Sequence, residues 1–550
     1  MFSTKVNSLG VKTQSQKASA NAFVNAGLKQ SAKTLSGNGA LKYSTSGCPF
    51  VDNFSNQGVY KNPRSFEDIS RDCSTLYGLD KTLFAKFAIY LRMINRKTQV
   101  IGYGLTESPQ VGGELKHESI MRMLWLHHKN PELFWNNIHL FLSAGSMKDI
   151  FVMLRYDLMY HGWDNRVLDW KKFGDLILTL LDNSNTVNLL KKYLPQIKSG
   201  SNCKTLECEA NTLIAKWICS LLFGNKQGNS GSTYKLYRKL KTSGTAHEWQ
   251  QLISQRKFDK IEFDKIHGRA LNKLVKTKFL KNQGLDDKYA EWIGERETAK
   301  YTGYVHELLC EIQNTTDNNM LATINAQFNE LVNKSKDGDL VTNMIVVRDT
   351  SGSMGSKAIG TKYTSNNIAK ALALYFSSFL KGSFADSWIE FASVTKMHKW
   401  HGSNVIEKWK NDRSEAYGST NFQGVIDLFC TLKNTVNESE FPTGIICISD
   451  GEFNSSGMDS NLEVALNKLR QAGFSDNYVK NFKIVLWNIP NGFYGSKSSV
   501  KFETYGPDAN AVYMSGYSAA QVKFLSTGKI ESPRDLFDNA MNQELIQLVR

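Results

Sequence analysis

Residues 345–356 read IVVRDTSGSMGS, and they place one aspartate and two serines at alternate positions directly after an apolar run. Asp349, Ser351 and Ser353 therefore offer one carboxylate and two hydroxyl groups from a single glycine-rich loop. A hard cation such as Mg²⁺ takes about six oxygen ligands and often keeps several of them as water. The spacing predicts a divalent-cation site, against the alternative of a glycine-rich turn that caps a helix without metal.

Two later segments carry oxygen-bearing side chains in matching positions. Thr420 lies in GSTNFQG, and Asp450 follows the apolar run of ICISDGEFN. Because ligands of open α/β sheets bind at the carboxyl ends of the strands, we expect these loops to meet the first one. The predicted metal ligands are Asp349, Ser351, Ser353, Thr420 and Asp450, with Mg²⁺ as the expected ion and Mn²⁺ or Ca²⁺ as alternatives.

The serines of this loop fit neither of two common enzyme motifs. A nucleophile elbow needs a glycine two residues before the serine, but Ser351 occupies that position relative to Ser353. A phosphate-binding loop needs Gly-Lys followed by Ser or Thr, whereas this loop continues as GSKA. We therefore expect no enzyme. A hydrolase ranks last among the function classes, although a Mg²⁺ site alone could serve phosphoryl chemistry.

The elements that must position these loops alternate between strands and helices after about residue 335. Short runs rich in Val, Ile and aromatic residues predict strands at 343–349, 388–394, 443–450 and 482–489. Helical patterns lie between them, the first with Ile368, Leu372 and Tyr375 on one face. Such alternation predicts βαβ units and a mainly parallel sheet with helices on both faces.

From about 66 to 330 the apolar residues follow a helical period instead. Phe134, Ile138, Phe141 and Leu142 form one such stripe, and SMKD at 146–149 has the spacing of a capping box. Successive helices with short joints predict a stacked helical array. No repeat of fixed period is visible, so a HEAT-like array is one arrangement among others.

Positive charge is concentrated in the later part of this helical region. The chain has a net charge of +15, and residues 226–300 hold 17 Lys or Arg against nine acids. Such a surface attracts phosphate backbones, and a solvated helix face is an equally weighted alternative. The candidate RNA-phosphate contacts are Lys265, Arg269, Lys273, Lys276 and Lys278.

Other features of composition concern the compartment. No run of eighteen apolar residues occurs, so no membrane segment is expected. Residues 1–65 read as a basic flexible arm, with no acid before Asp52. The eight cysteines contain no CxxC pair and are expected to be reduced thiols. We expect a cytoplasmic protein, or a virion component if a phage encodes it.

Several motifs together resemble a known family. They are LWLHHKNPELFWNN, GSMKDI and FDKIEFDKIHGRALNKLVKTKFL in the helical half, then DTSGSMGS, GSTNFQGVIDLF, SDGEFN, IVLWNIP and MSGYSAAQVKFL. The chain is similar to a TROVE-like family whose members join helical repeats to a von Willebrand factor type A domain, distant relatives of the Ro autoantigen. The likeness spans about residues 70–540 and is closest to a branch found in plants, protists, bacteria and bacteriophages.

The resemblance implies a helical array that binds RNA, and a type A domain whose metal ion accepts a carboxylate from a partner. This chain departs from it at Arg348, where relatives usually carry an apolar residue. A charge there could modulate the affinity for metal or for an acidic ligand.

The expected fold class is an all-helical, HEAT-like array followed by a doubly wound α/β type A domain. The expected domains are the basic arm at 1–65, the helical domain at 66–335, the type A domain at 336–530 and a C-terminal helix at 531–550. Our leading hypothesis is a non-enzymatic RNA-binding protein that also recruits a protein partner through the metal. The alternative is a protein-interaction or assembly scaffold that acts through the metal without nucleic acid.

Overall fold

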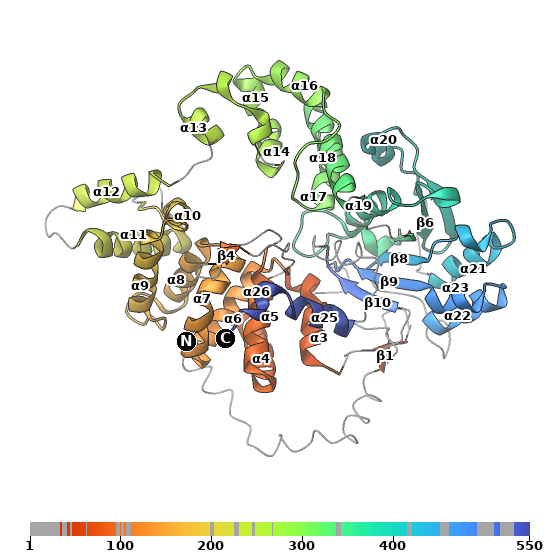
Figure 1. The fold of residues 1–550 in the computed structure, drawn as a ribbon, viewed down its shortest axis with the longest axis horizontal. Coiled ribbons are helices and arrows are strands. Elements are labelled where there is room, and N and C mark those ends of the chain that lie inside the picture. Colours follow the sequence, from red (N-terminus) through yellow and green to blue (C-terminus); the bar gives the residue numbers. More distant parts are fainter. Residues whose placement is uncertain are drawn as a thin grey trace, which may run out of the picture. The chain divides into compact units, whose positions relative to one another are not determined.

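The computed structural model forms two compact units (Figure 1). It describes residues 33–35, 41–43, 47–61, 63–94, 99–100, 104–105, 112–198, 203–224, 230–244, 248–266, 268–336, 343–414, 421–450, 461–491, 511–517 and 533–550. Among these, the first unit comprises 63–256 and 540–550, and the second comprises the residues before 62 and those of 257–539.

The first unit is almost entirely helical. Five of its helices begin after a side chain that accepts a hydrogen bond from the first turn, namely Ser65, Asp80, Asn130, Asp169 and Thr205. A two-stranded ribbon joins β3 (Gln99–Val100) to β4 (Gly104–Leu105). The helices are α4 (Phe66–Leu79), α5 (Lys81–Arg92), α6 (Lys116–Lys129), α7 (Pro131–Ala144), α8 (Lys148–His161), α9 (Trp170–Asp182), α10 (Val187–Tyr193), α11 (Leu206–Phe223), α12 (Ser230–Thr242), α13 (Glu248–Ser254) and α26 (Glu544–Gln547).

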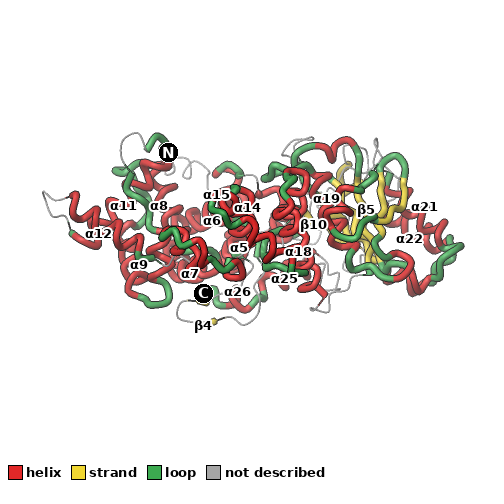
Figure 2. The backbone as a smooth tube through the Cα atoms, turned by 90° about the horizontal axis from the view of Figure 1, so that it is seen from above, coloured by secondary structure: helices red, strands yellow, loops and turns green. Residues whose placement is uncertain are grey.

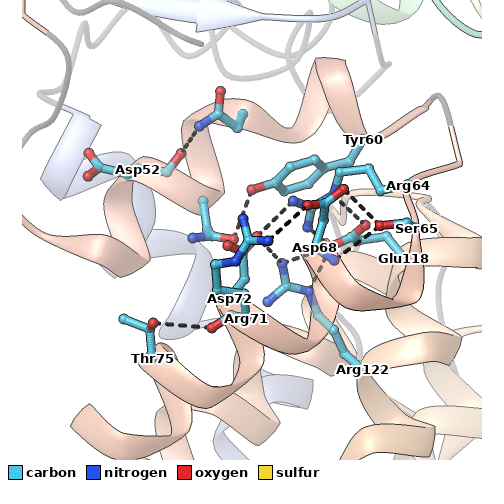
Figure 3. A network of polar contacts seen from close by, with 12 residues as sticks. Asp52, Tyr60, Arg64, Ser65, Asp68, Arg71, Asp72, Thr75, Glu118 and Arg122 are labelled. Atoms are coloured by element: carbon cyan, nitrogen blue, oxygen red, sulfur yellow. Dashed lines mark hydrogen bonds and ion pairs between the residues drawn. The ribbon is translucent and has the colours of Figure 1, made fainter. Parts of the chain in front are cut away.

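A buried ion-pair network ties the start of this unit to α6 (Figure 3). Glu118 is fully buried and accepts hydrogen bonds from Arg64 at 2.5 Å and from Arg122 at 2.8 Å. Asp72 of α4 pairs with Arg64 at 2.8 Å. Burial would raise the pKa of Glu118, but the two guanidinium groups lower it. The charges are therefore mutually satisfied, which a buried carboxylate requires.

The second unit contains helices before the sheet and after it. They are α3 (Pro49–Ser55), α14 (Gly268–Lys276), α15 (Phe279–Asn282), α16 (Asp286–Gly294), α17 (Val305–Leu309), α18 (Asn318–Lys336) and α25 (Pro533–Met541). A ribbon of β1 (Lys33–Leu35) and β2 (Leu41–Tyr43) precedes them. The helices from 257 to 336 group with the sheet, so the compact units do not follow the predicted boundary at 335/336.

A six-stranded sheet forms the centre of the second unit, with the order β10-β9-β8-β5-β6-β7. Its strands appear in yellow in Figure 2. All neighbours pair in parallel except the edge strand β7, which is antiparallel to β6. The bounds are β5 (Met344–Asp349), β6 (Ser387–Phe391), β7 (Thr395–Lys399), β8 (Gly444–Ser449), β9 (Lys483–Asn488) and β10 (Ala511–Ser515).

Helices cover both faces of this sheet, because successive strand residues point to opposite sides. Ile345 and Val347 of β5 pack with Val425 and Phe429 of α21 (Phe422–Leu432) in one apolar core. The same core includes residues of α22 (Asn461–Gln471) and α23 (Asp476–Asn481).

On the other face lies α19 (Ser365–Ser377), whose Phe376 contacts Trp487 of β9 with ring centroids 5.9 Å apart. The helix α20 (Val405–Lys410) follows the edge strand. The predicted fold class, a helical region followed by an α/β sheet with helices on both faces, is confirmed at this level. None of the helices within the described ranges has the length and apolar character needed to cross a membrane.

One expectation about the cysteines is wrong. Cys203 and Cys208 form a disulfide, because the turn before α11 brings their Cα atoms to 5.4 Å. The other six are free thiols, of which Cys73, Cys219, Cys310 and Cys447 are buried.

Candidate functional site

The predicted metal loops meet at one edge of the sheet because of the strand order. β5 and β8 are parallel neighbours, paired from Met344 opposite Gly444 to Arg348 opposite Ile448. Asp349 is the last residue of β5, and Asp450 directly follows β8. Both carboxylates therefore leave the sheet at the carboxyl ends of adjacent strands, where ligands of such sheets bind.

Hydrogen bonds fix the first loop around Asp349, which is fully buried. The backbone N–H of Ser351 donates to Asp349 Oδ1 at 2.8 Å, and Ser449 Oγ donates to Oδ2 at 2.6 Å. The hydroxyl oxygens of Ser351 and Ser353 lie 3.2 Å apart. The carboxylate and both hydroxyls of the motif are thus brought together as predicted.

Asn491 joins the second loop to the first. Its Nδ2 donates to the carbonyl oxygen of Ser353 and to Oδ2 of Asp450, each at 3.1 Å. Sequence reasoning missed Asn491 and Ser449. The available signal was position: Asn491 comes shortly after β9, the neighbour of β8, and Ser449 ends β8 itself.

The electrostatics of this edge are those of an uncompensated acidic pair. Burial, and after it the negative charge of Asp450, raise the pKa of Asp349 to about 7. Asp450 is 8 % exposed, and its Oδ1 is buried without a hydrogen-bond partner in the described structure. A buried carboxylate oxygen without a donor is costly, and a cation would satisfy it.

The donor set fits a hard divalent cation. The two carboxylates and two hydroxyls supply only oxygen, the ligand type that Mg²⁺ and Ca²⁺ prefer. Within the described ranges, no three His, Cys, Asp or Glu side chains gather as a metal site. The remaining predicted ligand, Thr420, lies outside the described residues.

Arg348, which precedes Asp349, belongs to a separate network on the face covered by α19. Its guanidinium donates to Asp412 at 2.8 Å and to Asn366 at 2.8 Å, and it lies 5.0 Å from the ring centre of Trp388. Asp412 also pairs with Lys370 at 3.1 Å. The charge of Arg348 is therefore compensated by Asp412.

The five predicted RNA-binding residues are all exposed, but three of them have acidic partners. The Lys265–Glu262 ion pair measures 3.0 Å and the Arg269–Glu307 pair 2.5 Å. Lys276 pairs with Glu311. Lys273 and Lys278, near the end of α14, form no ion pair with any described residue.

Glu311 is a third residue that sequence reasoning missed. It accepts from Lys276, from Lys362 at 2.7 Å and from the hydroxyl of Tyr363. Burial would raise the pKa of Glu311, but these hydrogen bonds lower it to about 2. Glu311 therefore links α14 to the chain that follows the first metal loop.

Comparison with known proteins gives two similarities. Residues 343–547 match a family model described as a domain of unknown function, DUF7788, a span that includes the sheet and both carboxylates. The chain is also 27 % identical over 402 residues to the uncharacterized protein L728 of Acanthamoeba polyphaga mimivirus. That alignment covers 67 % of this chain and 64 % of the viral protein, so the chain spans under two thirds of its relative.

Proposed function

We propose that this chain is a non-enzymatic binding protein that holds a divalent cation, Mg²⁺ first, at the carboxyl edge of its sheet. Asp349, Ser351, Ser353 and Asp450 hold the cation, and Thr420 completes the set. The bound cation supplies a coordination position that a carboxylate of a protein partner fills. The observation that carries the proposal is the buried Asp349–Asp450 pair, in which one oxygen of Asp450 finds no donor within the part of the chain that the structure describes.

The fold supports assigning this part of the chain to the von Willebrand factor type A class. A parallel sheet covered on both faces, with the DxSxS loop at its carboxyl edge, has the architecture that the resemblance implies. In the same way, we propose that the helices of the first unit are a TROVE-like, HEAT-like array.

RNA binding, which the sequence suggested as the leading hypothesis, has less support from the geometry. Three of the five predicted phosphate contacts already pair with Glu262, Glu307 and Glu311, and an RNA phosphate would have to displace these acids. The geometry therefore favours the alternative hypothesis, a scaffold that acts through the metal, over one that depends on nucleic acid.

Cation binding tests the first step of the proposal. Thermal unfolding of the protein treated with a chelator should shift upward when Mg²⁺, Mn²⁺ or Ca²⁺ is added, since the cation binds only the folded state. Asp450→Asn should remove the shift. Asp427→Asn is the matched control, because Asp427 is an exposed acid of α21 paired with Lys468. No shift for any of the three cations in the wild type would overturn the proposal.

Capture of a carboxylate tests the second step. A random peptide library selected in Mg²⁺ and eluted with EDTA should be enriched in Asp and Glu. The same selection on Asp450→Asn should show no such enrichment. Equal enrichment on both proteins would mean that the basic surface, and not the metal, recruits acidic peptides.

A further inference from the structure

A cavity of about 370 Å³ lies within the first unit, among α8, the segment after α10 and the start of α11. The residues that α8 contributes, Lys148, Phe151, Val152 and Arg155, follow the helical spacing of a single face. Its size is that of sites that bind small organic molecules. The cavity shares no lining residue with the acidic edge of the sheet.

The charges of the cavity are predominantly positive. Lys148, Arg155 and Lys198 line it, against one acid, Glu207. Glu207 pairs with Arg155, and its side chain is 58 % exposed. The two lysines have exposed side chains that neutralise no other group of the cavity. An anion that enters would therefore meet Lys148 and Lys198, which pair with no acid of the cavity, and Arg155, which already pairs with Glu207.

Two helix N-termini add to this positive potential. α8 begins at Lys148, and α11 begins directly after Thr205, whose hydroxyl accepts from the N–H of Cys208. Both Lys148 and Thr205 line the cavity. The N-terminal end of a helix carries a partial positive charge, which favours a phosphate or carboxylate nearby.

The guanidinium of Arg155, which lines the cavity, has a buried N–H group that also favours an anion there. Its side chain is 16 % exposed, and its Nε is buried with no acceptor among the described residues. A buried guanidinium N–H without an acceptor is costly to leave unpaired. We propose that the cavity lined by Lys148, Arg155 and Lys198 binds a small organic phosphate, whose oxygens pair with these three cations.

The remaining walls define the body of that ligand. Phe151 and Pro195 provide apolar surface, Tyr193 provides a ring, and Gln196 and Asn211 provide amides that donate and accept hydrogen bonds. This combination fits a ligand with a flat, partly polar body beside its phosphate, and the nucleoside 5′-monophosphates have this chemistry. Inorganic pyrophosphate tests the anion subsite alone.

Calorimetric titration with pyrophosphate and with each common nucleoside 5′-monophosphate tests the proposal on the full chain. Lys148→Gln/Lys198→Gln should weaken binding about tenfold, the effect of losing at least one charge-assisted hydrogen bond. Because both lysines are exposed, the variant should unfold at the wild-type temperature. Lys216→Gln is the matched control, since Lys216 is an exposed lysine of α11 that does not line the cavity.

Glu207→Gln provides a test of opposite sign. Glu207 competes with the anion for Arg155, so its neutralisation should tighten pyrophosphate binding about threefold, the range of an exposed ion pair. A purely structural role of the Arg155–Glu207 pair predicts weaker binding instead. Arg155→Gln should weaken binding in either case, and its thermal unfolding shows whether the fold survives.

The same phosphate could belong to a free nucleotide or to the end of an RNA strand. A short oligonucleotide with a 5′-phosphate, compared with its 5′-hydroxyl form, distinguishes the two sources. Preference for the phosphorylated oligonucleotide assigns the cavity to RNA ends, and binding of the mononucleotide alone assigns it to a free ligand. The proposal is overturned if neither pyrophosphate nor any monophosphate binds the wild type at about 1 mM, or if Lys148→Gln/Lys198→Gln binds like the wild type.

Discussion

The acidic edge of the sheet and the basic segment at 265–278 carry opposite charges and differ in how those charges are satisfied. Asp349 and Asp450 are both buried, and one oxygen of Asp450 has no hydrogen-bond partner among the described residues. Lys265, Arg269 and Lys276 are exposed, and each already has an acidic partner. The smaller cluster of charges is therefore the one whose buried groups are less completely paired.

This difference shows that a count of charges predicts a binding surface poorly. Exposed ion pairs contribute little to stability, but they reduce the charge that a polyanion would meet. Burial and the negative charge of Asp450 both raise the pKa of Asp349, so the ionised form of Asp349 is disfavoured unless a cation is bound.

The largest expected effect concerns the buried charge of Arg348. Unlike the acids at the sheet edge, Arg348 has a partner of opposite charge, Asp412. Asp412→Asn should lower the free energy of unfolding by about 3–5 kcal/mol, because it leaves Arg348 buried without its counter-charge. Arg348 and Asp412 have side chains only 2 % and 4 % exposed. Chemical denaturation measures the loss. A loss below about 1 kcal/mol, the range of an exposed pair, would show that this buried pair is no better compensated than the surface pairs.

The next effect concerns the acidic edge itself. Asp450→Asn should weaken Mg²⁺ binding about 100-fold or more, because one of two carboxylates in the site loses its charge. The same variant should be at least as stable as the wild type in EDTA, since the repulsion on Asp349 is removed. Calorimetry and thermal unfolding with and without Mg²⁺ separate the two effects. A variant less stable in EDTA would show that the metal-free acids are compensated after all.

A smaller loss of stability is expected at Glu311, which pairs with Lys276 of the basic segment and with Lys362. Glu311→Gln should cost about 1–3 kcal/mol at neutral pH, because hydrogen bonds to a charged group are lost. Its pKa is lowered from 4.5 to about 2, so its contribution is present above pH 4.5 and is lost as the pH falls toward 2. Denaturation across this window should show a steeper loss of stability for the wild type than for Glu311→Gln.

The smallest effect is expected for RNA. For single-stranded RNA, each phosphate contact contributes about 0.7 to the slope of log affinity against log salt. Lys273→Gln/Lys278→Gln should lower this slope by at most about 1.4, and Lys265→Gln/Arg269→Gln should leave it unchanged. A large loss in the second variant would mean that RNA displaces Glu262 and Glu307, and it would restore the RNA-binding hypothesis for the whole segment.

The sequence alone determined four of the six strands of the sheet, the helical character of the first unit and the position of both carboxylates at strand ends, but it missed β7 and β10. Local composition predicts the strands at 343–349, 388–394, 443–450 and 482–489. The first and third of these pair in parallel, which places Asp349 and Asp450 at one edge of the sheet. The DxSxS spacing also sets a local contact, because the backbone N–H of Ser351 donates to Asp349 two residues earlier. Such features depend on neighbours in the chain, which periodicity and spacing reveal.

Only the tertiary structure decided which charges are satisfied. Glu311 pairs with Lys276 and Lys362, which are 35 and 51 residues away, and Asn491 bridges Ser353 and Asp450 across 138 and 41 residues. The cavity of the first unit likewise combines α8 with the start of α11. Contacts at such separations are set by packing of whole elements, so no local pattern of residue types could have predicted them.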